Sequence, residues 1–248
     1  MGVEYCHYLI PRPNSFRPSA EQLAGLVEAW AKDHWIAAPG ADALKKMALI
    51  DEMPYEEAAE IWAHIRLSPG FALVPRSLTA EWFRRQMAGD LRLGFPVDHG
   101  DQIGLQYPLI SDSGPPHDPY YEIQIHLSSE YVQHVSELIG SEEIVCTCGE
   151  SLEFAADDDV FYASRIRIQC PRCSAVFDPS SIRVMVRDGW TGEKSWVNGG
   201  TIYRFAVVID CGKCIPERKR APIRANTALV ELCQKVLGHE FCEVGDLY

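Results

Sequence analysis

Two pairs of closely spaced cysteines are the residues of this sequence best suited to chemistry. Cys146 and Cys148 are separated by one residue, and Cys170 and Cys173 by two, with 21 residues between the pairs. A tetrahedral zinc ion is commonly held by four thiolates that arrive as two close pairs from two turns. A glycine or a proline follows one cysteine of each pair, as a tight turn requires. The sequence therefore predicts that these four cysteines bind one Zn²⁺.

Residues 144–178 resemble the zinc-ribbon family in this arrangement of cysteine pairs, over roughly a seventh of the 248-residue chain. The resemblance implies that Cys146, Cys148, Cys170 and Cys173 are the ligands. The first pair has one intervening residue, whereas zinc ribbons most often have two. Four thiolates close the coordination shell and leave no position for water, and no His-x-Glu or His-Glu-x-x-His pattern lies nearby. The zinc is therefore expected to be structural.

A third pair, Cys211 and Cys214, directly follows a predicted strand. It could replace the first pair as zinc ligands, bind a second ion with His239 and Cys242, or act as a redox pair. If the strands before Cys211 and after His239 are parallel, these residues lie at opposite ends of the sheet. A redox pair usually begins a helix, which lowers the thiol pKa, whereas prolines follow here. We favour neither metal binding nor catalysis for this pair.

Charge is unevenly distributed along the chain, whose net charge is −12. No Lys or Arg occurs between Arg92 and Arg165, and this interval carries 14 acidic residues, including Asp157, Asp158 and Asp159. Such a stretch either solubilises the surface or attracts a cationic protein, because an acidic field raises association rates. Our leading functional expectation is a protein-binding module of the inhibitor or immunity type, whose acidic face masks a basic partner.

The charge balance reverses over residues 165–224, which hold 12 basic and five acidic residues. This stretch supports an alternative function, a nucleic-acid- or transcription-associated zinc-ribbon protein, although the overall charge argues against a general nucleic-acid binder. The residues that would contact nucleic acid are Arg165, Arg167, Arg172, Arg183, Arg187, Arg218, Lys219, Arg220 and Arg224.

Two tryptophans and three histidines complete the candidate functional residues. Trp190 and Trp196 belong to a glycine-rich loop and either anchor a partner or fold back onto the sheet. An enzyme using His99, His117 and His126 as acid–base groups is a further alternative, but each is expected to be an ordinary loop or surface residue. No nucleophile with its base, phosphate-binding loop or carboxylate pair stands out in the sequence. We therefore favour a protein without enzymatic activity.

Hydrophobic periodicity supplies the elements that must position these residues. Helices are expected at 17–36, 54–67, 77–91, 128–140 and 226–237, the first with a capping box of Ser19 and Gln22 and the last closed by Gly238. Strands are expected at 5–10, 120–127, 165–170, 182–187, 201–210 and after 238, and a loop at 94–118. The 120–127 strand should be half-buried, with Tyr121, Ile123, Ile125 and Leu127 on its inner face.

These elements predict an α+β fold with a mixed sheet, several helices and an inserted four-cysteine zinc ribbon. Three regions are expected: an acidic α/β region at 1–143, the ribbon at 144–178, and a strand-helix-strand region at 179–248 that packs with the first as one globular unit. No apolar run approaches the roughly 18 residues that a membrane helix needs, and no signal peptide is expected. A cytoplasmic location and no membrane partner are therefore expected. Thiols stay reduced in the cytoplasm, so the nine cysteines suggest metal ligands or buried small residues rather than disulfides.

Overall fold

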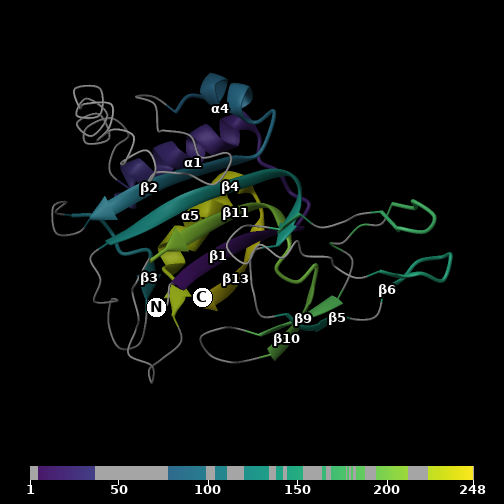
Figure 1. The fold of residues 1–248 in the computed structure, drawn as a ribbon. Coiled ribbons are helices and arrows are strands. Elements are labelled where there is room, and N and C mark those ends of the chain that lie inside the picture. The colour runs from purple at the N-terminus through teal and green to yellow at the C-terminus, as the bar shows by residue number, and fades with distance from the viewer. Residues whose placement is uncertain are drawn as a thin grey trace, which may run out of the picture.

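The computed structural model centres on a five-stranded antiparallel sheet in the order β13-β1-β11-β4-β2, with the short β8 beside β4 (Figure 1). It describes residues 5–36, 78–98, 104–110, 120–133, 138–141, 144–152, 164–165, 169–176, 178, 180, 183–187, 194–211 and 223–247. The strands of this main sheet are β1 (Tyr5–Arg12), β2 (Leu91–Asp98), β4 (Tyr120–Gln133), β8 (Ser164–Arg165), β11 (Tyr203–Asp210) and β13 (Glu240–Leu247).

Three smaller sheets accompany the main one: β10-β9-β5, β12-β3 and β6-β7. Their strands are β3 (Leu109–Ile110), β5 (Leu138–Ser141), β6 (Ile144–Val145), β7 (Ser151–Leu152), β9 (Arg183–Arg187), β10 (Lys194–Asn198) and β12 (Arg224–Ala225). The α+β class is confirmed. Every strand pairing in the described ranges is antiparallel, whereas a mixed sheet was expected.

Three helices are described: α1 (Ala20–Lys32), α4 (Ala80–Gln86) and α5 (Thr227–Leu237). The predicted capping box of α1 is confirmed, since the Gln22 N–H donates to Ser19 Oγ at 3.2 Å and the Ser19 N–H donates to Gln22 Oε1 at 2.9 Å. Helix α5 begins after Asn226 and ends at Gly238, whose φ of 76° suits glycine. The helix expected at 54–67 lies outside the described residues.

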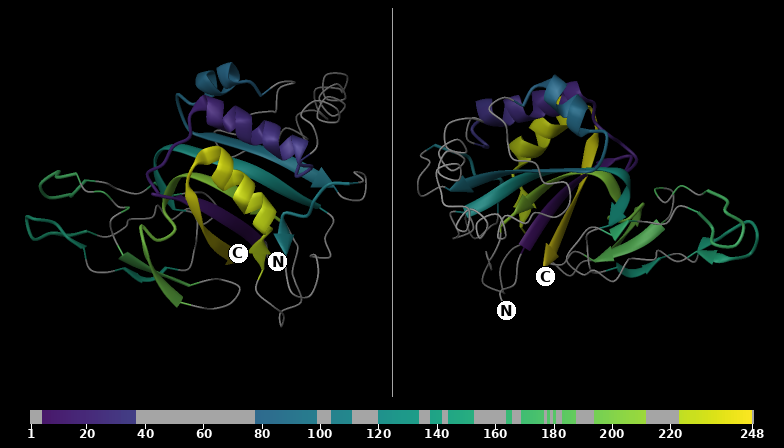
Figure 2. Two further views of the ribbon diagram at one scale, coloured as in Figure 1. Left: turned by 180° about the vertical axis from the view of Figure 1, so that it is seen from behind. Right: turned by 45° about the horizontal axis from the view of Figure 1, so that its top comes forward.

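Helices α1 and α5 cover one face of the main sheet, as the rear view shows (Figure 2). Apolar side chains from both helices and from alternate strand positions form the core beneath them. Its most buried members include Leu9, Leu23, Leu26, Trp30, Phe83, Leu93, Ile123, Ile125, Phe205, Val207, Ile209, Leu229 and Cys233. Burial of this apolar area is the main free-energy term that stabilises the fold.

The opposite face of the sheet is also buried at its centre. A second cluster there contains Cys6, Tyr8, Ile10, Val132, Tyr203, Ala206, Val208 and Val244, with Val197 of β10 packed against it. On β4, Gln124 and His126 are only 9% and 5% exposed. The four inward residues predicted for this strand are confirmed, but the strand is buried on both faces rather than half-buried.

The predicted loop at 94–118 is wrong in its first part, because residues 91–98 form strand β2. Leu91, Leu93 and Phe95 are buried and alternate as a strand requires. Gly94 and Pro96 interrupt this alternation, and both residue types are typical of loops, so the sequence predicts a loop here. Proline is tolerated here because β2 is the edge strand of the main sheet.

The predicted helix at 128–140 is also wrong, and with it the β-α-β arrangement expected there. Strand β4 continues to Gln133, and β5 begins at Leu138. Ser129 does not cap a helix: its N–H and hydroxyl both donate to Asp90 Oδ1, at 2.8 and 3.0 Å. Val132 pairs with Tyr203 of β11, so a distant strand overrides the local helical pattern.

Candidate metal centre

The first cysteine pair lies on the turn between β6 and β7. The Cys146 N–H donates to Glu150 O and the Gly149 N–H donates to Cys146 O, both at 2.8 Å. Gly149 has a φ of 84°, a conformation that favours glycine. This tight turn holds Cys146 and Cys148 on one side of the hairpin.

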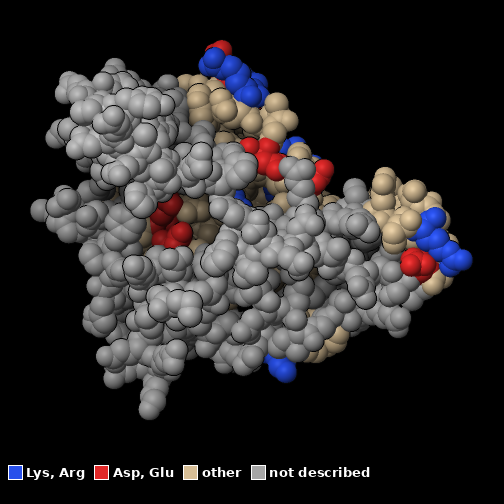
Figure 3. Space-filling model, viewed as in Figure 1, with Lys and Arg blue, Asp and Glu red and all other residues tan. Residues whose placement is uncertain are grey.

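The second pair lies on a similar turn, which a bridge between Gln169 and Val176 closes. The Cys170 N–H donates to Ala175 O and the Ser174 N–H donates to Cys170 O, both at 2.9 Å. The two hairpins also approach each other through Arg172 and Glu150, whose charged groups lie 3.9 Å apart. Figure 3 shows basic and acidic groups side by side at the right-hand end of the molecule, the end at which Figure 1 places β6.

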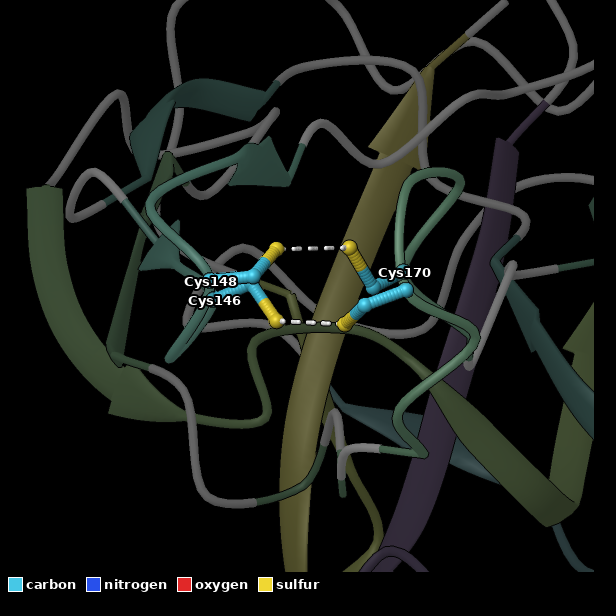
Figure 4. Close-up of side chains that lie close together, drawn as sticks. Cys146, Cys148 and Cys170 are labelled. Atoms are coloured by element: carbon cyan, nitrogen blue, oxygen red, sulfur yellow. Dashed lines mark hydrogen bonds between the residues drawn. The ribbon is translucent and has the colours of Figure 1, made fainter.

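The four sulfurs converge from the two hairpins, as predicted (Figure 4). All four lie within 4.8 Å of one another, with Cys146 Sγ 3.5 Å from Cys173 Sγ and Cys148 Sγ 3.7 Å from Cys170 Sγ. Disulfide sulfurs would be about 2.05 Å apart, so these are free thiols. Among the described residues, no other group of three or more Cys, His, Asp or Glu side chains is arranged to hold an ion.

The pKa values of these closely spaced thiols shift in opposite directions. The backbone N–H of Cys148 stabilises the Cys146 thiolate and lowers the pKa of Cys146 to about 6. For Cys148, the backbone N–H of Glu150 lowers the pKa, but burial and the neighbouring sulfurs outweigh it and raise this pKa to about 12. Four thiolates this close repel one another unless a cation lies between them, so the cluster can hold a metal ion.

The third pair is only partly described. Cys211 is buried just after β11, and Cys214 lies outside the described residues. Strands β11 and β13 both run antiparallel to β1, so they are parallel to each other. Cys211 follows Asp210, which pairs with Cys6, while His239 precedes the residue paired with Arg12 at the other end of β1. This separation supports the expectation that Cys211 and His239 do not share an ion.

The other predicted partner-binding and acid–base residues are largely outside the described residues. These are Asp157, Asp158, Asp159, Trp190, His99 and His117. Trp196 is described and 44% exposed, but it lies in strand β10 rather than in a loop. Of the basic residues, Arg165, Arg183, Arg187 and Arg224 lie in β8, β9 and β12, and Arg172 lies on the second cysteine hairpin. Arg167, Arg218, Lys219 and Arg220 are not described.

His126 is not the surface residue that the sequence predicts. It belongs to a hydrogen-bonded chain on the face of the main sheet opposite the helices. Tyr203 Oη lies 3.1 Å from His126 Nδ1, and His126 Nε2 lies 2.7 Å from Gln124 Oε1. Because an amide oxygen only accepts, His126 Nε2 donates to Gln124 Oε1. The histidine therefore positions the Gln124 side chain.

The hydrogen bonds that join Tyr203, His126 and Gln124 continue to two carboxyl groups, those of Glu122 and Asp210. Neither was predicted from the sequence to be a functional residue. Gln124 Nε2 donates to Glu122 Oε2 at 2.6 Å and lies 3.4 Å from Asp210 Oδ2. Glu122 and Asp210 are paired in register across β4 and β11. Burial, and then the nearby negative charge of Asp210, raises the pKa of Glu122 to about 7. The sequence shows Glu122 and Gln124 as alternate residues of one strand, but it does not show that Asp210 of β11 lies beside them.

We expect the substitution Glu122→Gln to stabilise the protein above neutral pH. The folded-state pKa is about 7 and the ordinary value is 4.5, so the folded state binds more protons between these values. The contribution of Glu122 to stability therefore falls as pH rises from about 4.5 to about 7. Urea unfolding at pH 8 should show the variant to be about 2 kcal/mol more stable than the parent, with little difference at pH 4.5.

The exposed Glu130 of the same strand provides the matched control, because Glu130→Gln removes a carboxylate from the surface of the same strand. A difference between Glu122→Gln and the parent that is the same at pH 4.5 and pH 8 would show that Glu122 does not titrate near neutrality.

No described helix combines the length and apolar character needed to cross a membrane. In three comparisons with known proteins, no protein-family model, no curated protein and no solved structure matches this chain.

Proposed function

We propose that the four-cysteine cluster is a structural Zn²⁺ site of the zinc-ribbon kind. The observation that supports it is the spacing of the sulfurs, since the two short separations are 3.5 and 3.7 Å. Four sulfurs about 2.3 Å from a tetrahedral zinc ion lie about 3.8 Å from one another. Thiolate sulfur is a soft ligand that selects zinc over magnesium or calcium.

The zinc fastens two hairpins that bury little else. Of the four ligands, only Cys170 is buried, and the neighbouring Val176 is 68% exposed. Hairpins of this size are marginal without a further constraint. The free energy of metal binding therefore serves as folding free energy for this part of the chain. Free thiols and a thiolate-bound zinc persist in a reducing compartment, in keeping with a cytoplasmic location.

We further propose that the protein is a binding module of the inhibitor or immunity type, whose acidic region engages a basic protein. The uninterrupted acidic stretch between Arg92 and Arg165 supports this proposal, with 14 acidic residues and no Lys or Arg. Opposite charge accelerates association and excludes acidic competitors. The zinc has only a structural role in this function.

The test is to capture partners from the source organism with the zinc-loaded chain and to measure binding of the captured protein at several salt concentrations. A basic partner whose affinity falls steeply with salt is expected, because salt screens exposed charges over about 8 Å at physiological ionic strength. Replacing Asp157, Asp158 and Asp159 by asparagine should weaken binding. An equal change of charge at the exposed Glu28, Glu231 and Glu240, each to glutamine, should weaken it much less. An acidic partner, or an affinity insensitive to salt, would contradict the proposal.

A further inference from the structure

Two arginines that are distant in the sequence, Arg17 and Arg204, lie close together beside the main sheet. Arg17 precedes α1, and Arg204 lies on β11 where its register with the neighbouring β4 shifts (Figure 1). The Arg204 backbone N–H donates to Asn14 O at 3.2 Å, and the rings of Phe16 and Phe205 meet edge to face at 6.1 Å. The segment before α1 therefore runs along the start of β11, and the two guanidinium charges interact.

Each guanidinium is held by a backbone carbonyl and has one donor left over. Arg17 Nη2 donates to Met87 O at 3.4 Å, and Arg204 Nη2 donates to Ser129 O at 2.6 Å. Arg204 also lies over the Tyr131 ring, 5.9 Å from its centroid. In both arginines Nε is buried and has no hydrogen-bond partner within the described part of the chain. A buried N–H group of a charged side chain is costly without an acceptor, so an acceptor at this place would be stabilising.

The nearby carboxylate does not neutralise the two arginines. Asp90 Oδ1 accepts hydrogen bonds from the Ser128 hydroxyl at 3.0 Å and from the N–H and hydroxyl of Ser129 at 2.8 and 3.0 Å. Burial, and then the positive charge of Arg204, lower the pKa of Arg17, and the negative charge of Asp90 only partly opposes them. Across the described ranges, neither arginine forms an ion pair. The pair therefore carries a local excess of positive charge.

We propose that Arg17 and Arg204 together bind a phosphate group, either as inorganic phosphate or as part of a small phosphate monoester. A guanidinium group matches two oxygens of a carboxylate or a phosphate. One arginine is enough to engage both oxygens of a carboxylate, whereas the three or four free oxygens of a phosphate can serve two arginines at once. The bound anion would also offset the repulsion between the two guanidinium groups. This inference does not rest on the zinc ion or on a basic protein partner.

The test is isothermal titration of the zinc-loaded full chain with sodium phosphate at pH 8 and constant ionic strength. We expect one phosphate per chain with a Kd on the order of 1 mM, and at least tenfold weaker binding of acetate. The net charge of −12 opposes non-specific binding of anions, so saturable binding reports a local site. O-phosphoserine is titrated in parallel: tighter binding than phosphate would identify a monoester as the ligand, and weaker binding would identify the free ion.

Conservative variants separate the guanidinium geometry from charge alone. Arg204→Lys and Arg17→Lys keep the positive charge but lose the planar guanidinium group and its Nε–H, so each should weaken phosphate binding at least about tenfold. Arg85→Gln removes a whole positive charge at a 69% exposed position of α4 and should change the affinity less than about twofold. Zinc content and circular dichroism equal to those of the parent would show that each variant is folded.

Thermal unfolding distinguishes a binding site from two arginines that only hold backbone carbonyls. Phosphate should raise the Tm of the parent relative to sodium chloride of equal ionic strength, and this rise should disappear in Arg17→Lys. If the arginines were only structural, the variant would lower Tm by the same amount with and without phosphate. That result, no saturable binding of phosphate by the parent, equal binding of acetate, or unchanged phosphate affinity in both folded lysine variants would overturn the proposal.

Discussion

Replacing Cys170 by serine is expected to reduce bound zinc from one ion per chain to a small fraction of that. Cys170 is the most buried of the four ligands, at 2% exposure, and its sulfur lies 3.7 Å from Cys148 Sγ. Structural zinc sites contribute on the order of 10 kcal/mol of apparent binding free energy, and the loss of one thiolate removes much of it. Metal analysis of the purified variant measures the effect directly.

The same substitution should loosen the two cysteine hairpins and leave the main sheet folded. The Cys146 and Cys170 N–H groups, protected by hydrogen bonds to Glu150 and Ala175, should exchange rapidly with solvent in the variant. Protection of β4 and β11 should persist, because the core beneath the helices contains no zinc ligand. Cys242→Ser, at a partly exposed cysteine on β13, is the control and should keep a full zinc content. Full zinc occupancy in Cys170→Ser would exclude Cys170 as a ligand.

Replacing Ile125 by alanine is expected to destabilise the fold by about 3 kcal/mol. Ile125 is 0% exposed and pairs with Val207 on one side and Leu93 on the other. Truncation there removes buried apolar contacts and leaves a cavity between the sheet and the helices. Urea unfolding of the zinc-loaded protein measures the change.

Ile110→Ala is the matched control, because it makes the same substitution at an exposed position. It is 42% exposed on β3, so Ile110→Ala should cost less than about 0.5 kcal/mol. Equal losses at the two positions would contradict a central, buried β4.

Local signals made the helix ends predictable from the sequence. The Ser19–Gln22 capping box and the Gly238 stop each satisfy backbone groups within a few residues of themselves, so their evidence is contained in the adjacent sequence. The alternation of Ile123 and Ile125 on β4 is local in the same sense.

Strand pairing between distant segments could not be predicted in the same way. Residues 128–133 carry a helical pattern, but Val132 pairs with Tyr203 and with Arg165 and is 6% exposed. Those contacts join segments far apart in the chain and outweigh a propensity difference of less than about 1 kcal/mol per residue. Strand β2 was missed because glycine and proline interrupt it, and its place at the sheet edge becomes visible only in the fold.

The cysteine cluster could be predicted from the sequence and the carboxyl pair could not, because only the first depends on local spacing. Cysteine spacing within each turn revealed the metal cluster, because each hairpin presents its own pair of sulfurs. The carboxyl pair of Glu122 and Asp210 depends on the register of β4 against β11, which the sequence does not state. The sequence predicts a surface position for His126 because it does not indicate that the second face of the main sheet is also buried.

Metal analysis and X-ray absorption at the zinc edge, both on the full chain, can test whether the four sulfurs form a closed zinc site. We expect one zinc ion per chain with four sulfur neighbours at about 2.3 Å and no nitrogen or oxygen neighbour. A chain that binds no stoichiometric zinc, or a shell that includes nitrogen or oxygen, would contradict it.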